Sequence, residues 1–238
     1  KNIRKNIYLI KNSQTIEKNR FLEISSKRKL FQNLTNDFIR IDANLEKKIL
    51  KYLENNLKKY DLVIVNDFGH GLLTKKIRKF LQKFSKYLAL NCQTNSSNNG
   101  YNFITKYQRA NYITIDEPEA RLSTQKRFAD IKEVSQILRK QINFNICAIT
   151  RGENGCVVFK RNSSEIKNCP VLSDKVEDTL GAGDSFFALS SLFSKIKKDL
   201  DVIGFIGNVS GALKVSYLGH RKYIDKSSIM SFIKSLMA

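Results

Sequence analysis

The sequence predicts an α/β fold with three layers, in which a mainly parallel sheet lies between helices, together with a small β-rich lid. Two observations predict the sheet: short continuous apolar runs such as Leu62-Val63-Ile64-Val65 recur along the chain, and stretches with helical apolar spacing separate them. A third predicts the lid, because the first part of the chain has only short alternating pieces broken by Lys, Asn and Ser. We expect a single domain, 1–238, with the lid at about residues 6–40.

The predicted elements follow one another in a regular order. A helix at 45–59 repeats apolar residues at helical spacing, and the strand at 62–65 follows it. Thr74 has the residue type of an N-cap, so a helix is expected from there to about residue 86. The other expected elements are strands at 87–91, 112–115, 146–150 and 156–160, and helices at 123–141, 182–195, 200–217 and 226–236.

The composition favours a soluble protein. Hydrophobic residues make up 42% of the chain and charged residues 27%, and no apolar run approaches the roughly 18 to 20 residues of a membrane span. No signal-peptide pattern is present, so we expect a cytoplasmic location. Isolated Cys and His residues argue against a zinc site or a disulfide framework.

The formal net charge of +20 raises the question of nucleic-acid binding. The lysines are spread over nearly all predicted helices instead of forming one cluster. A solvated basic surface is therefore favoured over a nucleic-acid footprint, and anionic small substrates fit the charge equally well.

The segment 176–188 carries the strongest chemical signal. Small residues sit where a helix begins, so unpaired N–H groups and the positive end of the helix dipole can face an anion. A carboxylate beside that anion can accept a proton from an attacking hydroxyl, which is what phosphoryl transfer requires. The alternative is an ordinary glycine-containing loop, but the full spacing favours the phosphate site.

Asp178-Thr179-Leu180-Gly181-Ala182-Gly183-Asp184 resembles the C-terminal signature of the ribokinase (PfkB) carbohydrate kinases. The resemblance implies a ribokinase-like fold and an activity that uses ATP and Mg²⁺. It makes Asp184 the catalytic base and the amides of Gly181, Ala182 and Gly183 the anion hole. It also places Asp178 and Thr179 near the phosphates or a monovalent cation.

Three other segments fit the same family in the same order. Thr150, Gly152 and Gly155 resemble the strand and turn that approach the nucleotide phosphates, although alone they are only a turn with two glycines. Glu119 resembles the Glu of an Asn-x-x-Glu element that organises Mg²⁺ through water, with Asp116 in the place of Asn. Asn208 falls near the family's adenine site, where packing within a helix explains it equally well.

Segments nearer the start are similar to the kinase module of bacterial heptose-phosphate kinases. Lys18 and Arg20 match a Thr-x-x-Lys-x-Arg strand, and Asp67 and Gly69 match a loop that flanks the sugar site. The two cations suit a phosphate already on the sugar, or they are solvated residues of an edge strand. Asn91 ends a strand where amides can meet sugar hydroxyls, or it begins a polar loop.

The resemblance predicts a kinase that transfers the ATP γ-phosphoryl to a sugar or sugar phosphate, with a homodimer formed through the lid. Family members begin with a strand and a Gly-Gly element, and neither precedes Lys1, so we expect an N-terminally truncated domain with part of the sugar pocket missing. Two alternatives stay open. One is a kinase for nucleosides or other small alcohols, and the other is a non-catalytic basic binding protein on a kinase scaffold.

Overall fold

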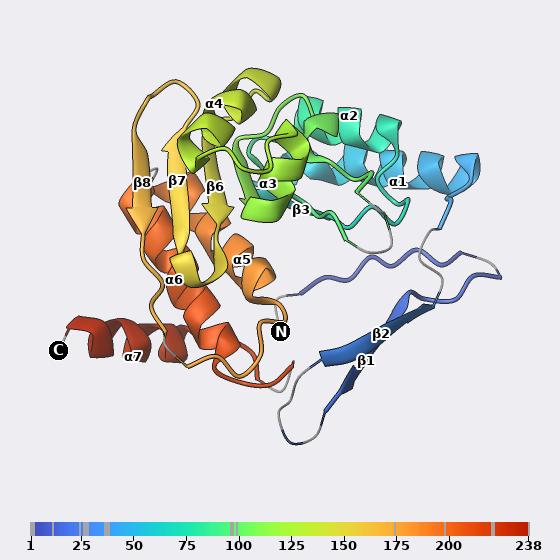
Figure 1. The fold of residues 1–238 in the computed structure, drawn as a ribbon. Helices are drawn as coiled ribbons and strands as arrows, with labels where there is room; N and C mark the ends of the chain where they lie inside the picture. Colours follow the sequence, from blue (N-terminus) through green and yellow to red (C-terminus); the bar gives the residue numbers. More distant parts are fainter. Residues whose placement is uncertain are drawn as a thin grey trace.

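A six-stranded sheet in the order β3-β4-β5-β6-β7-β8 forms the centre of the protein (Figure 1). The computed structural model describes residues 3–10, 12–23, 25, 29–35, 39–95, 98, 100–173, 175–197, 199–219 and 222–237. The strands are β3 (Val63–Asp67), β4 (Leu88–Cys92), β5 (Tyr112–Asp116), β6 (Ile146–Thr150), β7 (Cys156–Lys160) and β8 (Ile166–Cys169). Strands β3 to β6 are parallel, whereas β7 pairs antiparallel with both of its neighbours.

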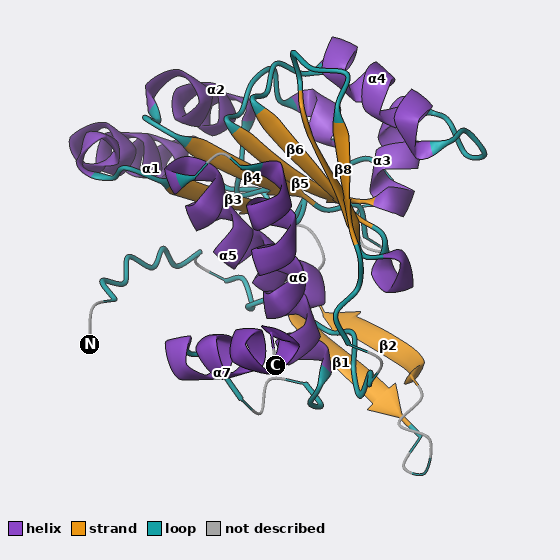
Figure 2. Ribbon diagram, turned by 90° about the vertical axis from the view of Figure 1, so that its left-hand side faces the viewer, coloured by secondary structure: helices purple, strands orange, loops and turns teal. Residues whose placement is uncertain are grey.

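Helices cover both faces of this sheet, so the predicted three-layer α/β/α fold is confirmed (Figure 2). One face carries α1 (Ala43–Asn56), α2 (Lys75–Phe84), α3 (Glu117–Thr124) and α4 (Ile131–Gln141). The other carries α5 (Ala182–Ile196) and α6 (Leu200–Val215), and α7 (Lys226–Met237) packs against α6. Short 3₁₀ turns are η1 (Leu57–Lys59), η2 (Ile104–Lys106) and η3 (Gly152–Asn154).

The inner strands β4 to β7 are mostly buried on both sides because each side meets a layer of helices. In β6, for example, Cys147 and Ile149 join the core under α1 to α4, while Ile146 and Ala148 join the core under α5 and α6. The alternation of side chains along a strand explains this division. In these inner strands the continuous apolar runs therefore report burial on both faces, whereas Ile64 in the run on edge strand β3 is 42% exposed.

Local capping signals set most helix ends, and one predicted helix is divided into two. Thr74 caps α2, as predicted, by accepting a hydrogen bond from the N–H of Ile77 at 3.3 Å. The single helix expected at 123–141 is wrong, because Gln125 adopts a left-handed conformation that ends α3 and Asp130 caps a new helix, α4. Strand β8 was not predicted.

A separate antiparallel pair, β1 (Glu17–Leu22) and β2 (Lys29–Thr35), forms the lid. Figure 1 shows it beyond the end of the sheet toward which β6 points. The predicted lid region 6–40 also contains residues 6–10, which are extended without strand pairing, and there Tyr8 and Ile10 pack against the core under α1 to α4. Within the described residues, no helix is long and apolar enough to cross a bilayer.

Candidate active site

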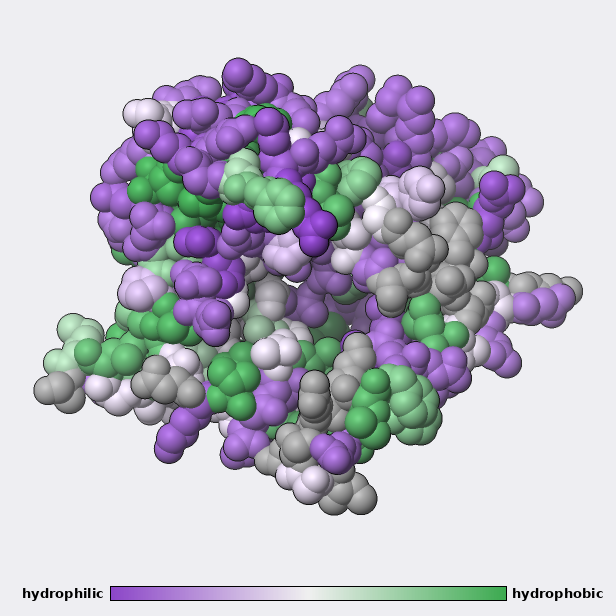
Figure 3. Space-filling model, viewed as in Figure 1, coloured by the Kyte–Doolittle hydropathy of each residue, from purple (hydrophilic) through white to green (hydrophobic). Residues whose placement is uncertain are grey.

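A cavity of about 210 Å³ lies where β4, β5 and β6 end. In open α/β sheets, ligands bind in the crevice outside the carboxyl ends of the strands. Figure 3 shows the surface hollowed in the middle of this face, between the sheet and the part formed by the lid and α7. The lining residues are Asn91, Gln93, Thr94, Thr114, Ile115, Asp116, Glu119, Thr150 and Gly183.

The start of α5 reaches this cavity through Gly183. Gly181, the N-cap, has a φ of 78°, and no side chain caps the helix among the described residues. The N–H of Ala182 donates to the carbonyl of Thr179 at 3.2 Å, and the next N–H groups, of Gly183 and Asp184, have no partner within the helix. A Cβ at Gly183 would meet no atom within 4 Å, so the space beside these amides is open. This geometry suits an anion.

Asp184 is exposed at the first turn of α5, and two other elements approach it. Gln93, just after β4, donates from Nε2 to Asp184 Oδ1 at 3.2 Å. Lys18 of β1 is close enough that the Asp184 charge acts on it: burial lowers the Lys18 pKa, Arg20 lowers it further, and Asp184 opposes them. The lid thus brings a cation to the predicted base.

Glu119 lies buried at the cavity wall, in the first turn of α3. Its carboxylate accepts from the N–H of Thr94 at 2.7 Å and from the N–H of Asp116 at 3.2 Å. Asp116 in turn caps α3 by accepting from the N–H of Glu119 at 2.7 Å. Burial, with a smaller contribution from the Asp116 charge, raises the pKa of Glu119 to about 7. Burial also raises the pKa of Asp116.

The donor set at this wall fits a magnesium ion held mainly through water and phosphate oxygens. Mg²⁺ usually keeps several waters and takes one or two protein carboxylates. Glu119 and Asp116 are the two carboxylates at this wall that could hold such an ion, and the described residues contain no group of three or more metal-binding side chains. Asn91 donates from Nδ2 to the carbonyl of Thr114 at 3.0 Å, whereas its buried Oδ1 has no hydrogen-bond partner in the described structure. A buried acceptor of this kind is suited to a bound water or a ligand hydroxyl.

Thr150 and the turn after it stand beside the wall that contains Glu119. Thr150 ends β6 and lines the cavity, and Gly152 and Gly155 have φ values of 57° and 70°. A side chain at Gly155 would collide with the carbonyl of Cys169, so only glycine fits there. Arg151, between Thr150 and Gly152, pairs with Glu117 of α3 at 2.9 Å.

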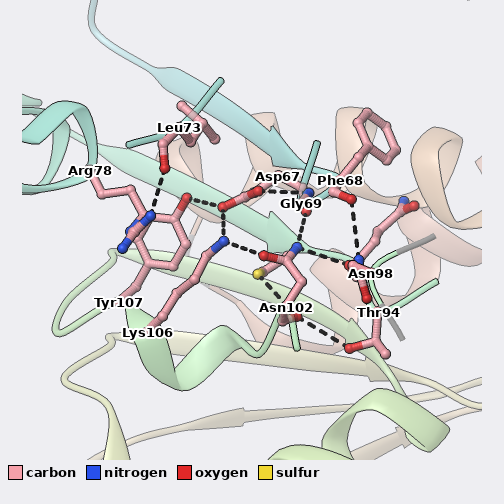
Figure 4. A network of polar contacts seen from close by, with 12 residues as sticks. Asp67, Phe68, Gly69, Leu73, Arg78, Thr94, Asn98, Asn102, Lys106 and Tyr107 are labelled. Atoms are coloured by element: carbon pink, nitrogen blue, oxygen red, sulfur yellow. Dashed lines mark hydrogen bonds and ion pairs between the residues drawn. The ribbon is translucent and has the colours of Figure 1, made fainter. Parts of the chain in front are cut away.

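Asp67 occupies a buried polar network at the end of β3 (Figure 4). Its carboxylate accepts from the Tyr107 hydroxyl and pairs with Lys106, both at 2.6 Å, and it accepts from the N–H of Gly69 at 3.0 Å. Asn102 donates to the Asp67 carbonyl and, likewise at 2.9 Å, to the carbonyl of Gln93. The network fixes the segment that carries Gln93, and a contact of Asp67 with substrate stays a prediction.

The remaining predicted residues lie next to α5 and α6. Asp178 accepts from the N–H groups of Leu180 at 2.9 Å and Gly219 at 2.8 Å. Asn208 donates to the carbonyls of Cys169 at 3.1 Å and Pro170 at 2.7 Å, so it fastens α6 to the end of β8. A contact of Asn208 with adenine stays a prediction.

The cavity thus unites Asn91, Glu119, Thr150 and Gly183 from four separate parts of the chain. Sequence reasoning included Gln93 only in the amide-rich segment that begins at Asn91, and it did not assign roles to Thr114, Asn102, Lys106 or Tyr107. Gln93 follows a strand end, which is a usable signal. The partners of Asp67 carry no such signal, because Lys106 and Tyr107 lie in and directly after the short turn η2, far from Asp67 in the sequence.

Comparison with known proteins agrees with this geometry. The model of the pfkB family of carbohydrate kinases matches residues 5–226. A curated relative, the bifunctional protein HldE of Aliarcobacter butzleri, is 26% identical over 250 residues, which cover 97% of this chain and 50% of the relative. HldE of Campylobacter curvus is 25% identical over 182 residues, covering 75% and 38%. The chain thus spans half or less of the length of these relatives.

Solved structures show the same fold. Arabidopsis thaliana ribokinase complexed with ribose and ATP has a TM-score of 0.69 at 14% identity, covering 94% of this chain and 70% of the other. Escherichia coli phosphofructokinase-2 in complex with potassium has a TM-score of 0.68 at 11% identity, covering 87% and 67%. Sinorhizobium meliloti adenosine kinase has a TM-score of 0.66 at 14% identity, covering 93% and 66%.

The resemblances predicted from 178–184 and from the heptose-kinase segments are therefore confirmed, and so is the ribokinase-like fold. The family model covers most of the chain, and Gly183 of the segment 178–184 lines the cavity at the strand ends. The chain belongs to the pfkB family of carbohydrate kinases.

Proposed function

We propose that this protein transfers the γ-phosphoryl group of ATP to a hydroxyl of a sugar or sugar phosphate. The observation that carries the proposal is the position of the α5 start: Gly183 lines the cavity at the strand ends, and Asp184 stands beside it with Gln93 and Lys18. An anion site, a base and a cation are thus available at one place. These are the parts that phosphoryl transfer requires.

ATP with Mg²⁺ supplies the phosphoryl group and neutralises part of its charge. Glu119 would hold waters of the metal from the cavity wall, and its ionised form is the better acceptor for them. The turn that would lie against the nucleotide phosphates contains Thr150, Gly152 and Gly155. Asp178 and Thr179 would lie behind the anion site, and Asn208 would lie near the adenine of the nucleotide.

The acceptor hydroxyl would lie between Asp184 and the N–H groups at the start of α5. Asp184 accepts its proton, and the turn formed by Gly181, Ala182 and Gly183 stabilises the charge on the transferred group. The N–H of Gly183 is the main donor, because it has no helical partner, whereas that of Ala182 already donates to the carbonyl of Thr179. Gln93 holds Asp184 through Oδ1, which leaves Oδ2 for the proton. Asn91 offers its unpartnered Oδ1 to a sugar hydroxyl or to a bound water.

We further propose that the acceptor carries a phosphate, recognised from the lid. Lys18 and Arg20 alternate with Asn19 on β1, so both point to one face of the lid, and the charge of Asp184 acts on Lys18. Two cations at this spacing suit a doubly charged group. The acceptor is then a sugar phosphate of the kind suggested by the heptose-kinase resemblance.

We also propose that two copies of the chain assemble through the lid. The chain forms one kinase domain with its lid, acting in the cytoplasm where ATP is abundant. Phe21 and Phe31 stack at a centroid distance of 4.3 Å on the lid face opposite Lys18, and both are exposed. A second copy of the lid is the partner that would cover them, which gives a homodimer.

The test is a transfer assay with γ-labelled ATP and a panel of sugars, sugar phosphates and nucleosides. We expect labelled product with a sugar phosphate and no more than background with nucleosides. Preference for a nucleoside would favour the second kinase function. Salt-dependent nucleic-acid binding without Mg-ATP binding or transfer would favour the non-catalytic alternative and reject the proposal.

A further inference from the structure

Lys214 is a buried cation in the last turn of α6, next to the segment that leads into α5. Only 5% of its surface is exposed. Its ammonium donates to the carbonyl of Gly219 and lies 5.1 Å from the centre of the Tyr217 ring. Lysine is almost never buried to this extent unless its charge is compensated. Here the compensation comes from a carbonyl, an aromatic face and the negative end of the helix dipole.

Gly219 connects this ammonium to Asp178. The N–H of Gly219 donates to Asp178 Oδ2 at 2.8 Å, so one residue offers its N–H to the carboxylate and its carbonyl to the ammonium. The N–H groups of Glu177 and Asp178 donate to the carbonyl of Val215, at 2.8 and 3.3 Å. The segment that leads into the Gly181 turn is therefore docked on the end of α6 through contacts that surround Lys214.

This donor set disagrees with a free monovalent cation at the same place. The family resemblance puts such a cation near Asp178, and the phosphofructokinase-2 structure noted above contains potassium. In this chain both carboxylate oxygens of Asp178 accept from backbone amides, and the Gly219 carbonyl already accepts from an ammonium. A free cation at that carbonyl would meet a like charge at contact distance, which is unfavourable in a buried site.

We propose that the ammonium of Lys214 replaces the monovalent cation and holds the phosphate-binding segment in place without an added ion. A cation attached to the chain is present at a high effective concentration, so the site is always filled. The catalytic consequence rests on the proposed kinase function, but the replacement of the cation by the Lys214 ammonium does not.

The experiment measures thermal unfolding in KCl, NaCl and tetramethylammonium chloride at equal ionic strength, without substrate. For the parent chain we expect midpoints that agree within about 1 °C in the three salts. Lys214→Ala removes the ammonium and opens its space, so K⁺ should stabilise this variant by about 5 to 10 °C over tetramethylammonium when K⁺ is near a hundred times its Kd. Lys195→Met is the matched control, because Lys195 is an exposed helical lysine that also lies over a tyrosine ring.

The control should behave like the parent in all three salts. A parent chain that K⁺ stabilises specifically would overturn the proposal, since its site should already be filled. An Ala variant that responds equally to the three salts, or that fails to fold even in KCl, would also overturn it. Because unfolding is measured without substrate, a negative result here is distinguishable from a failure of the kinase proposal, which only the transfer assay tests.

Discussion

At the scale of single residues, Asp184 is the group on which turnover should depend most. Asp184→Asn keeps an oxygen for the hydrogen bond from Gln93 but cannot take the proton of the acceptor hydroxyl. We expect turnover to fall by about 10² to 10⁴, or roughly 3 to 5 kcal/mol of barrier, with little change in ATP affinity. Steady-state kinetics with ATP titration measures both quantities.

Asp199→Asn is the control for this change, since Asp199 caps α6 and Asn caps helices equally well. It should keep parental turnover. Near-parental turnover in Asp184→Asn would remove that residue from the role of base.

Glu119 predicts a pH-dependent need for magnesium. Its pKa is raised to about 7, so below that pH it is mostly protonated and a poorer partner for the metal and its waters. The apparent magnesium affinity of the parent should therefore fall by up to about tenfold per pH unit below pH 7 and level off above it. Glu119→Gln resembles the protonated form, so it should need more magnesium at pH 8 and lose the pH dependence.

Magnesium titrations of the rate between pH 5.5 and 8 check this prediction. Glu133→Gln serves as the control, because Glu133 also lies in the first turn of a helix but pairs with Lys126 at the surface. If parent and Glu119→Gln give the same titrations at every pH, Glu119 acts only through the capping box that it forms with Asp116 at the start of α3.

At the scale of elements, strand β1 should determine the choice of acceptor. Lys18 and Arg20 share one face of β1, and Lys18 is half-buried toward Asp184. Replacing both with Ala should lower kcat/KM for a phosphorylated sugar more than for its unphosphorylated counterpart. Hydrogen bonds to a charged group contribute about 1.5 to 3 kcal/mol each, so we expect a difference between about tenfold and several thousandfold.

Asn19→Ala, on the opposite face of the same strand, is the matched control and should leave the preference intact. Equal losses for both acceptors in the double variant would assign Lys18 and Arg20 to the folding or closing of the lid. Unchanged values for both would identify them as solvated surface residues.

Elements also show how far the sequence could be read. The inner strands were predictable because burial on both faces of the sheet requires continuous apolar runs. The amphipathic helices were predictable from the helical spacing of their apolar residues. The division between α3 and α4 was not predictable, because the left-handed conformation that ends α3 is usually signalled by Gly or Asn, and here Gln125 adopts it. Strand β8 has the sequence IKNC, which shows no clear alternation. The α5 site was predictable from a local motif, whereas the Asp67 network depends on partners 39 and 40 residues away in sequence.

At the scale of the whole molecule, the lid predicts a dimer. Phe21 and Phe31 are 47% and 57% exposed, which is unusual for two stacked aromatic rings. We expect the parent to sediment as a dimer at micromolar concentration. Phe31→Glu should shift it to a monomer, because a charge would be buried between the copies.

Phe128→Glu is the control, since Phe128 is 89% exposed but lies between α3 and α4, away from the lid. It should leave the sedimentation coefficient unchanged. A parent that sediments as a monomer throughout this range would contradict assembly through the lid.

The ion pair between Arg151 and Glu117 has a consequence for the order of binding. It joins the glycine turn after β6 to helix α3, which carries Glu119 two residues beyond Glu117. The segments expected to hold nucleotide and metal are therefore mechanically linked. If this link couples the two sites, nucleotide raises the affinity for metal by the same factor as metal raises the affinity for nucleotide, because coupling between binding free energies is reciprocal. Nucleotide should consequently bind more tightly when the metal is present than when it is absent.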